Sequence, residues 1–434
     1  MIFSSAAIYT WFRTVHPLLA VYDRITPTCA GLIPNAQVAP SEGENMSDED
    51  RREDVLLNLT RSHLDIGMRG VPVGTCRTSS VSSDGGVHYV GYPIAEVAEK
   101  DPEDIVFLLF NKRLPEPQEA VEFRADLFAR ATIPDGALEV LENLPREGHP
   151  MDWLSIGIQT IGMLGKTNDW REDSLNLIAR MPWLMAAIFR IRGGRSGPVP
   201  IVDPHIGIAE AFVAMLEPAP EQVEDMVKVL RTFLVLHMDH GGGNLSTFTG
   251  KAVASGHADL YASMAAAMNA LSGPLHGRAN QSCLEFVMRI GTDDPIEVEK
   301  FVRNELAEKK PVFGFGHAVL RVEDPRATFQ FSLGERICPD DPNFRIIRTL
   351  REVAPRVLAE NPRISNPNAN VDIASGTLLH HVGFRKPDYY TTFFGWARVV
   401  GIGAQIVDER TVARNGKGVP IYRPKYIAVN QDRD

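Results

Sequence analysis

The chain has 434 residues, of which 44% are hydrophobic and 23% are charged. These values are ordinary for a globular protein, and the length is enough for a large core and two lobes. The formal net charge of −10 argues against a general nucleic-acid binder. The four cysteines lie far apart without a CxxC pair, so they indicate neither a disulfide framework nor a structural zinc site and favour a reducing compartment: Cys29, Cys76, Cys283 and Cys338.

Residues 1–45 are predicted to be a loosely ordered extension. Residues 2–22 are mostly apolar and aromatic, but Arg13, His16 and Pro17 interrupt them, so no run is long enough to span a bilayer. The positive charge lies inside the apolar part rather than before it, unlike a secretory signal, and a transit peptide would be richer in Arg and Ser. Met46 opens a segment typical of a natural start, so whether residues 1–45 exist in the cell stays open.

Strand signal is sparse. Thr75 to Val81 and Val87 to Val90 flank a Ser-Ser-Asp-Gly-Gly run, which predicts a β-hairpin. The tail from Val419 to Val429 is consistent with a short strand or an extended arm.

Helical patterning dominates from about residue 102 onward. Apolar residues spaced three and four apart predict helices over 105–110, 120–131, 153–164, 174–191, 222–240, 258–271, 343–360 and 390–407. Gly273 and Pro274 end the buried segment 258–271, which places His276 just beyond a helix C-terminus. Pro355 predicts a kink in the helix over 343–360.

The fold class that follows is mostly α, with two lobes. We expect a large helical domain from residues 46–275 and 383–434, and a smaller domain, residues 276–382, inserted into it. A cleft between the two lobes is where a substrate would bind.

The motif HMDHGGGN, residues 237–244, admits three interpretations. His237, Asp239 and His240 have a spacing that could ligate a metal. The three glycines could instead present backbone N–H groups to an anion, or the motif could be an ordinary helix end. The motif alone does not decide between them.

Three further motifs carry groups suited to proton transfer: GPLHG (273–277), GFGHAVLR (314–321) and NANVDIASG (368–376). His276 and His317 can give or take a proton near neutral pH. Asp372 lies before a helical stretch, where an aspartate is usually an N-cap, but partial desolvation would make it a catalytic base. Gly314 and Gly316 alternate with aromatic residues and expose the backbone to a ligand.

Several arginines could bind phosphate or carboxylate groups. Arg321 and Arg326 follow the GFGH run, although a solvated surface charge is the commoner fate of an arginine. Arg398 lies in the apolar segment FFGWARVVG, where it must pair with a structural carboxylate or face a ligand carboxylate, because an unpaired buried charge is costly. Arg423 in IYRPK is the least determined by pattern. Gly395, Gly401 and Gly403 would allow close packing of this segment.

Together these motifs resemble citrate synthase, closest to the form found in eukaryotic mitochondria. The resemblance runs from Gly67 to Lys425 and includes HMDHGGGNLSTFT, AAAMNALSGPLHGRANQ, GFGHAVLRVEDPRAT, NANVDIASG and YRPK in order. It implies condensation of acetyl-CoA with oxaloacetate to citrate and CoA, in a homodimer. It implies no separate cofactor and no metal, because acetyl-CoA is a substrate, and neither nucleic acid nor a membrane as a partner. A cytoplasmic location, or the mitochondrial matrix in a eukaryote, is expected.

The resemblance also implies a role for each matched residue. Asp372 would take a proton from the thioester methyl group, His276 would stabilise the enol or enolate, and His317 would polarise the oxaloacetate carbonyl and supply a proton. Oxaloacetate carboxylates would be bound by His240, Arg326, Arg398 and Arg423, the last from the partner subunit. CoA would be bound by Arg69, Arg321 and the backbone of Gly314, Phe315 and Gly316.

The sequence departs from the family's usual pattern at a few positions. Gly241 stands where a glutamate is usual, Met238 precedes Asp239, and Val90 stands where an arginine is common. Lys166 is the one counterpart of a basic residue that meets CoA from the other subunit.

Three rival functions remain at this stage. 2-Methylcitrate synthase would use propionyl-CoA, and one methylene in an apolar pocket changes preference by only about 1–3 kcal/mol. A metal-dependent hydrolase would use the histidines and the aspartate of HMDH. A non-catalytic CoA-binding relative would have no physical need for His276, His317 and Asp372 together.

Overall fold

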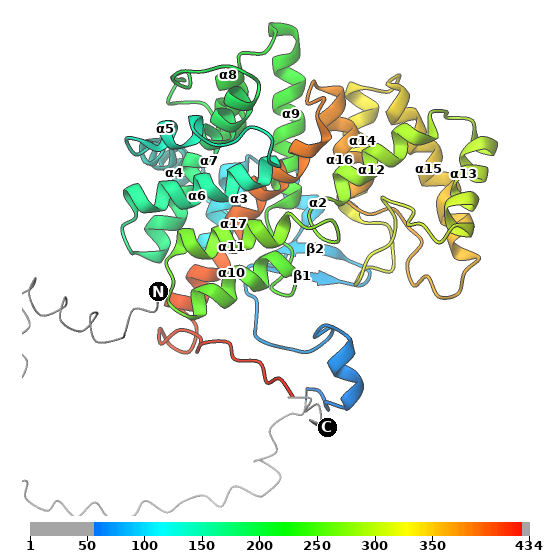
Figure 1. Ribbon diagram of the computed structural model, residues 1–434, viewed down its shortest axis with the longest axis horizontal. Coiled ribbons are helices and arrows are strands. Elements are labelled where there is room, and N and C mark those ends of the chain that lie inside the picture. The colour runs from blue at the N-terminus through cyan, green and yellow to red at the C-terminus, as the bar shows by residue number, and fades with distance from the viewer. Residues whose placement is uncertain (1–55, 428–434) are drawn as a thin grey trace, which may run out of the picture. The chain divides into compact units, whose positions relative to one another are not determined.

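The computed structural model describes residues 56–427, which belong to two units, Met1–Pro72 and Val73–Asp434 (Figure 1). The prediction for residues 1–45 lies outside the described residues. The described part of the first unit holds a short 3-10 helix, η1 (Arg61–Asp65), followed by the exposed Arg69.

The second unit is mostly helical, as the sequence predicts. Its helices are α2 (Ile94–Val97), α3 (Pro102–Asn111), α4 (Pro117–Arg130), α5 (Ala137–Glu142), α6 (Pro150–Gly165), α7 (Trp170–Arg192), α8 (Ile208–Leu216), α9 (Pro220–His237), α10 (Leu245–Ser255), α11 (Leu260–Leu271), α12 (Ala279–Ile290), α13 (Pro295–Ala307), α14 (Pro325–Ile337), α15 (Pro342–Ala359), α16 (Asp372–His381), η2 (Pro387–Tyr389) and α17 (Tyr390–Thr411). Each predicted helix has a counterpart, and α15 runs without a break through Pro355.

Many of these helices begin at an aspartate or glutamate followed by proline, which is a strong start signal because proline at N1 needs no hydrogen-bond partner. Asp294 and Asp341 are examples, and each accepts hydrogen bonds from the first backbone N–H groups of its helix. No helix in the described part of the chain has both the length and the apolar character needed to cross a bilayer.

The predicted hairpin is present and gains a third strand. β1 (Ser79–Ser82) pairs antiparallel with β2 (Gly86–Tyr89), with Ser79 opposite Tyr89, and β3 (Tyr92–Pro93) extends the sheet. Gly86 has φ +79°, and a Cβ there would lie 2.7 Å from Pro325 Cγ, so a glycine lets the hairpin approach the start of α14. The described part of the predicted tail strand, residues 419–427, contains no strand.

Helix α17 is the centre of the second unit. Most of its residues are buried, and it packs against α7, α9, α10 and α11 (Figure 1). A Cβ at Gly401 would collide with the carbonyl of Met238, so this glycine allows α17 to touch the segment that follows α9. The glycines that the sequence singled out for close packing are therefore confirmed in that role at Gly395 and Gly401.

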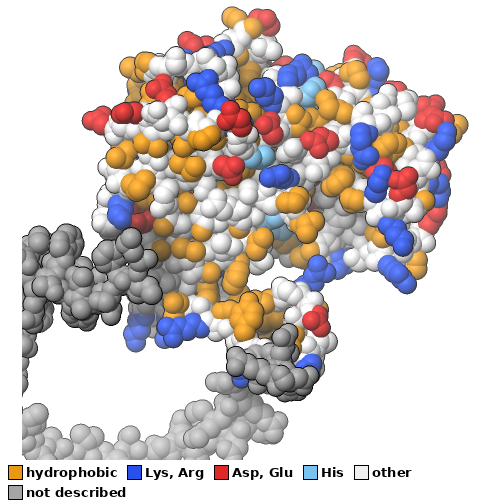
Figure 2. Space-filling model, in the orientation of Figure 1, with side chains coloured by type: hydrophobic (Ala, Val, Ile, Leu, Met, Phe, Trp, Pro, Cys, Tyr) orange, Lys and Arg blue, Asp and Glu red, His pale blue; other side chains and the backbone are white. Residues whose placement is uncertain are grey.

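Helices α12 to α16 pack largely against one another and gather on one side of the second unit (Figure 1). This grouping resembles the smaller lobe expected for residues 276–382. Residues 73–434 nevertheless cluster as one compact unit, so the boundaries at 276 and 382 stay a prediction. On the face shown in Figure 2, acidic and basic side chains are intermixed rather than gathered into a field of one sign.

Candidate active site

Two of the predicted histidines meet in the structure. His240 follows the C-terminal end of α9, and His317 follows the GFG run; their Nε2 atoms are 3.2 Å apart. Most of the buried groups that perturb their pKa values are also predicted site residues, namely Arg326 and Arg398. The structure therefore brings residues from α9, the 313–321 segment, α14 and α17 to one place.

The segment that carries His240 is held rigidly. Asp239 is fully buried and accepts hydrogen bonds from Thr78 Oγ1 at 2.5 Å and from Gln405 Nε2 at 2.8 Å. Its Oδ1 also accepts from the backbone N–H of His240 at 2.8 Å. The hydroxyl of Tyr89 donates to Val235 and accepts from the backbone of Asp239. The hairpin and α17 together thus fix the backbone at His240.

The protonation of His317 follows from its contacts. Its Nδ1 accepts from the backbone N–H groups of Val319 and Leu320, each at 3.0 Å, so the ring proton of the neutral form is on Nε2. That Nε2–H faces His240 Nε2, which places the proton of His240 on its Nδ1. Burial, with the charge of Arg326 adding to it, lowers the pKa of both histidines. Both rings are therefore neutral at pH 7, and His317 presents a donor.

The contacts of His276 also fix its tautomer, but with the roles of the two ring nitrogens exchanged. Its Nε2 accepts from the backbone N–H of Ser246 at 3.1 Å, and Ser246 Oγ lies 2.9 Å away. The ring proton is therefore on Nδ1. Burial lowers the pKa of His276 to about 4, and Arg398 contributes in the same direction. A neutral imidazole that donates from Nδ1 is the form needed to hydrogen-bond a developing oxyanion.

Asp372 is the first residue of α16 rather than its N-cap, which corrects the commoner expectation for an aspartate at this place. The carboxylate has no capping hydrogen bond; instead Asn370 Oδ1 accepts from the backbone N–H of Asp372 at 3.0 Å. Burial raises the pKa of Asp372 to about 6, although Arg326 and Arg398 oppose that shift. A carboxylate in this environment has the desolvation that a catalytic base requires.

The GFG segment and the segment before Asp372 form a short antiparallel bridge. Gly316 N–H donates to the carbonyl of Asn368 at 3.0 Å, and Asn370 N–H donates to the carbonyl of Gly314 at 2.9 Å, with Phe315 opposite Ala369. Asn370 Nδ2 also donates to the carbonyl of Gly316 at 3.0 Å. Gly314 and Gly316 both have positive φ, near +84° and +83°. This bridge fixes the backbone beside His317 relative to that of Asp372.

In such a bridge the backbone N–H and C=O of the central residue point away from the partner strand. For Phe315 they face away from residues 368–370, and no hydrogen bond to them is present among the described residues. Those groups could hold a ligand. The carbonyls of Gly314 and Gly316 are already occupied within the chain.

Two buried arginines lie near these groups, with different partners. Arg326 pairs with Asp324 through two hydrogen bonds of 3.0 and 2.7 Å. Arg398 has no ion pair within residues 56–427; its Nε donates to the carbonyl of His237 and its guanidinium lies 4.7 Å from the centre of the Phe394 ring. Its Nη1 is buried without a hydrogen-bond partner among the described residues. Burial lowers the pKa of Arg398 to about 10. This environment favours the alternative in which Arg398 faces a ligand carboxylate over the one in which it pairs with a structural carboxylate.

The remaining predicted cations are exposed. Arg321 Nη1 donates to the carbonyls of Val319 and Leu320 and has no carboxylate partner in the described part of the chain. Arg423 makes no ion pair or hydrogen bond with any residue the structure describes. Arg69 belongs to the first unit, and its role stays a prediction. Lys166 pairs with Asp259 at 2.8 Å.

Comparison with known proteins agrees with this arrangement. A family model described as "Citrate synthase, C-terminal domain" matches residues 67–425. The peroxisomal citrate synthase of Saccharomyces cerevisiae is 34% identical over 400 residues, which cover 85% of this chain and 84% of that protein. The mitochondrial citrate synthase of Citrus maxima is 34% identical over 404 residues, with 86% and 84% covered. The chain belongs to the citrate synthase family.

Solved structures of the family have the same fold. The citrate synthase of Thermotoga maritima aligns with a TM-score of 0.73 at 29% identity, covering 85% of this chain and 96% of that one. The citrate synthase of Thermoplasma acidophilum, solved in a ternary complex with carboxymethyl coenzyme A and oxaloacetate, aligns with a TM-score of 0.74 at 23% identity, covering 85% and 97%. The resemblance in sequence is thus confirmed, as is the mostly helical fold.

The contacts of His237 and Asp239 argue against the metal interpretation of HMDHGGGN. His237 is buried, its Nδ1 lies 2.7 Å from the carbonyl of Phe233, and its ring stacks on that of Phe233. Both carboxylate oxygens of Asp239 already accept hydrogen bonds. No group of three or more His, Cys, Asp or Glu side chains within residues 56–427 is placed to hold a metal ion. The motif is a structured helix end that presents His240.

Sequence reasoning missed several groups that hold the candidate site together. Ser246, Asn370 and Asp324 act through hydrogen bonds to His276, to the backbone of Asp372 and to Arg326. Two of them carried a readable signal: Asp324 precedes a proline at a helix start, and Asn370 stands two residues before Asp372, where an asparagine side chain typically accepts from the backbone. The contact between Ser246 and His276 carried none, because it joins residues 30 positions apart.

Proposed function

We propose that this member of the citrate synthase family condenses acetyl-CoA with oxaloacetate and hydrolyses the product to citrate and CoA. The observation that carries the proposal is that two suitable groups both lie within reach of the charge of the buried Arg398: a desolvated carboxylate, Asp372, and a histidine, His276, that its surroundings keep neutral with its proton on Nδ1. The methyl group of a thioester is a very weak acid. A base therefore needs a partner that stabilises the negative charge on the thioester oxygen.

The reaction would run as follows. Asp372 takes a proton from the methyl carbon, and the electrons of that C–H bond form the carbon–carbon double bond of an enol or enolate. The thioester oxygen accepts a hydrogen bond from Nδ1–H of His276. The nucleophilic carbon attacks the ketone carbon of oxaloacetate, and the ketone oxygen takes the proton of His317 Nε2. The ring regains a proton from solvent as Asp372 releases the one it took, so both side chains return to their starting forms. Water then hydrolyses the citryl thioester, which releases citrate and CoA.

The environment of the second substrate supports the same reaction. Oxaloacetate carries two carboxylates and needs several cationic or donor partners. Arg398 supplies a buried guanidinium with an unpaired Nη1, and His240 supplies a neutral ring beside His317. In the structure the Nε2–H of His317 faces His240. The substrate carbonyl would take over that proton contact when it binds.

We further infer a homodimer in which Arg423 completes the partner's oxaloacetate site. Arg423 is exposed and makes no ion pair among the described residues, as expected for a cation that acts on another chain. We infer that the Arg423 contact to an oxaloacetate carboxylate comes from the partner chain. Relatives named as mitochondrial or peroxisomal support the mitochondrial matrix of a eukaryote as a location, and do not support the cytoplasm.

The test is release of free thiol from acetyl-CoA and from propionyl-CoA, each with and without oxaloacetate. We expect release that depends on oxaloacetate, with kcat/KM at least about tenfold higher for acetyl-CoA, the low end of what one methylene contributes. A preference for propionyl-CoA would make the protein a 2-methylcitrate synthase. Release that ignores oxaloacetate, or no release at all, would contradict both.

A further inference from the structure

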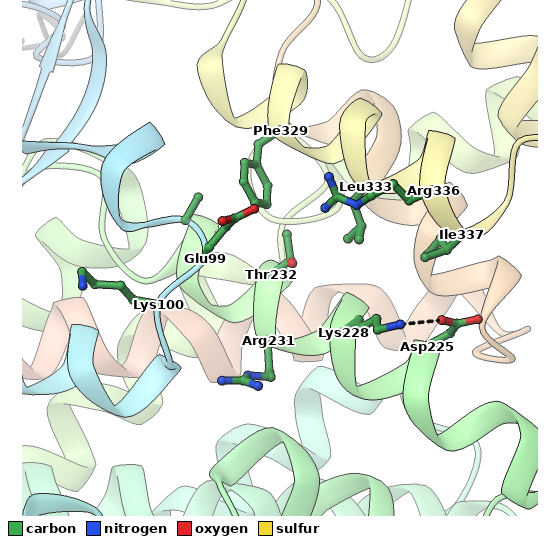
Figure 3. A pocket seen from close by; sticks show the side chains of 11 residues that line it. Glu99, Lys100, Asp225, Lys228, Arg231, Thr232, Phe329, Leu333, Arg336 and Ile337 are labelled. Carbon is green, nitrogen blue, oxygen red and sulfur yellow. Dashed lines mark ion pairs between the residues drawn. The ribbon is translucent and has the colours of Figure 1, made fainter. Parts of the chain in front are cut away.

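A crevice lies between α9, α14 and the turn after α2, and its lining includes neither the site histidines nor Asp372 (Figure 3). Its volume is about 420 Å³, enough for a small organic molecule. Residues from three stretches of chain line it: Ala98, Glu99 and Lys100; Asp225, Lys228, Arg231 and Thr232; and Phe329, Leu333, Arg336 and Ile337.

One wall of the crevice is apolar. Phe329, Leu333 and Ile337 are spaced four residues apart on α14, so they share one face of the helix. Leu333 is buried, and Phe329 and Ile337 are half-buried. Figure 3 shows the ring of Phe329 and the side chain of Leu333 reaching down from α14 toward Thr232 on α9. This wall could contact a compact apolar group.

The crevice also has hydrogen-bond donors that could bind an anion. Arg336 lies beside Leu333 in Figure 3, and it takes part in no ion pair within residues 56–427. Thr232 supplies a hydroxyl from the opposite helix. Lys228 pairs with Glu224 at 2.6 Å and more loosely with Asp225 at 3.7 Å. These are surface pairs, which contribute little and can be exchanged for a ligand.

The lining carries two further cations, Arg231 and Lys100. Arg231 pairs with both Asp101 and Glu210, and Figure 3 shows its side chain turned away from Arg336. The side chain of Lys100 also extends away from α14 in Figure 3. Three donors from two facing helices therefore remain: a guanidinium, an ammonium and a hydroxyl. Each of them can donate to a terminal oxygen of a phosphate monoester, a group that guanidinium binds in forked geometry.

The two helices that form the crevice also carry proposed substrate contacts. α14 begins one residue before Arg326, and α9 ends at His237, just before His240. A molecule held by Arg336 and Lys228 would set the separation of these helices. It would thereby change the position of Arg326 relative to His240, because helices transmit displacement along their length as nearly rigid bodies.

We propose that this crevice binds a phosphate monoester with a small apolar body, and that its occupancy changes the affinity for oxaloacetate. The second half rests on the proposed function; the first does not. By linkage, the factor by which the phosphate ester changes oxaloacetate affinity equals the factor by which oxaloacetate changes the affinity for the phosphate ester.

The first arm of the test is a calorimetric titration of the full-length protein with phenyl phosphate. The variant is Arg336→Gln. The matched control is Arg356→Gln, an exposed arginine in the last turn of α15 that makes no ion pair among the described residues. We expect saturable binding that Arg336→Gln weakens about tenfold, the size of one charge-assisted hydrogen bond, and that Arg356→Gln leaves unchanged. Equal affinity in the wild type and Arg336→Gln, or no saturable binding at millimolar phenyl phosphate, would overturn the site.

The second arm measures, by calorimetry, the Kd for oxaloacetate with and without saturating phenyl phosphate, and the Kd for phenyl phosphate with and without oxaloacetate. We expect both to change by the same factor, at least about threefold, and the effect on the Kd for oxaloacetate to vanish in Arg336→Gln. Binding without any change in either affinity would overturn the coupling. Binding by a protein that shows no condensation would contradict the proposed function and leave the site standing. Oxaloacetate could instead compete directly with phenyl phosphate for one site, in the wild type and in Arg336→Gln alike. That result would place the ester in the active site and overturn the proposal.

Discussion

At the scale of single residues, the direction of one hydrogen bond determines what His276 can do. The backbone N–H of Ser246 can only donate, so the Nε2 that faces it must accept. This contact holds the ring in the tautomer that donates from Nδ1. It also opposes protonation, because a proton on Nε2 would meet the Ser246 N–H. The backbone of α10, rather than the serine hydroxyl, is therefore the feature that prepares His276.

Ser246→Pro tests this assignment, because proline removes the N–H at a position in the first turn of α10 where no helical hydrogen bond is lost. We expect kcat to fall about tenfold or more and the pKa of His276, followed by NMR titration of its ring protons, to rise by about one unit, the value of one lost hydrogen bond.

The control is Ser246→Ala, which keeps the N–H and removes only the hydroxyl. It should change the pKa of His276 little. Equal pKa values of His276 in the two variants would show that the backbone contact does not control the protonation of His276.

Asp372 should make the folded protein less stable at neutral pH. Burial raises its folded pKa to about 6, above the ordinary value of 3.8. The carboxyl group therefore contributes its full stability below about pH 4, and that contribution is lost as the pH rises through 6. We expect Asp372→Asn to raise the free energy of unfolding by about 1–3 kcal/mol near pH 7.5, and by less near pH 5. Urea unfolding at both pH values measures the difference in the free energy of unfolding between the variant and the wild type. A variant less stable than the wild type near pH 7.5 would contradict the destabilising effect of the buried carboxylate.

At the scale of elements, the bridge between residues 314–316 and 368–370 connects the groups on either side of the candidate site. Asn370 is its central side chain, since Nδ2 donates to Gly316 and Oδ1 accepts from Asp372. The two segments are joined across 54 positions of sequence. Neither forms a regular strand, so the bridge depends on this side chain more than a longer ladder would.

Asn370→Ala should therefore misplace Asp372 without removing any group that reacts. We expect kcat to fall about tenfold to a hundredfold, because small misplacement of a reacting group is costly, while the KM for oxaloacetate changes less. Steady-state kinetics measures both. Asn366→Ala is a useful comparison, since Asn366 caps carbonyls of Leu320 and Val322 in the neighbouring loop. An Asn370→Ala variant with the kcat of the wild type would show that the bridge does not position the base.

The elements themselves follow from local patterns. The apolar spacing of 222–240 and 390–407 predicts α9 and α17 because each helix buries one or more faces, and the Asp-Pro pairs mark helix starts. The bridge at Phe315 and the third strand, β3, carry no such signal, since each is only one or two residues long. Helix α15 continues through Pro355, where Ala354 and Val357 are buried, so the proline does not end the helix; the kink at Pro355 stays a prediction.

For the candidate site, motif chemistry picks out His276, His317 and Asp372, but not their protonation states. Those depend on Ser246, on the N–H groups after His317 and on burial, none of which is visible from spacing. The sequence leaves two possibilities for Arg398, and only the structure shows a guanidinium with no carboxylate partner among the described residues.

At the scale of the whole molecule, the proposed site needs two chains. Arg398 belongs to the chain that carries His276, whereas Arg423 would come from its partner. In a homodimer, Arg398→Leu and Arg423→Leu should each inactivate both sites, because each removes one carboxylate contact.

Mixed dimers separate this arrangement from a site within one chain. A dimer with one chain of each variant has one site with both defects and one site with neither. Unfolding and refolding an equal mixture should therefore restore about one quarter of the wild-type activity, since about half of the dimers are mixed and each has one intact site. Refolding each variant alone is the control. No recovery in the mixture, with dimers shown by sedimentation, would place Arg423 in its own chain's site.

The central claim is that Asp372 takes the methyl proton from acetyl-CoA while the other groups bind the substrates. The direct measurement is oxaloacetate-dependent thiol release by Asp372→Asn, together with calorimetric binding of oxaloacetate to the same variant. We predict that kcat falls by about a hundredfold to ten-thousandfold, the usual contribution of a general base, while the Kd for oxaloacetate stays within about threefold of the wild type. A variant that binds oxaloacetate normally and keeps the kcat of the wild type would contradict the account.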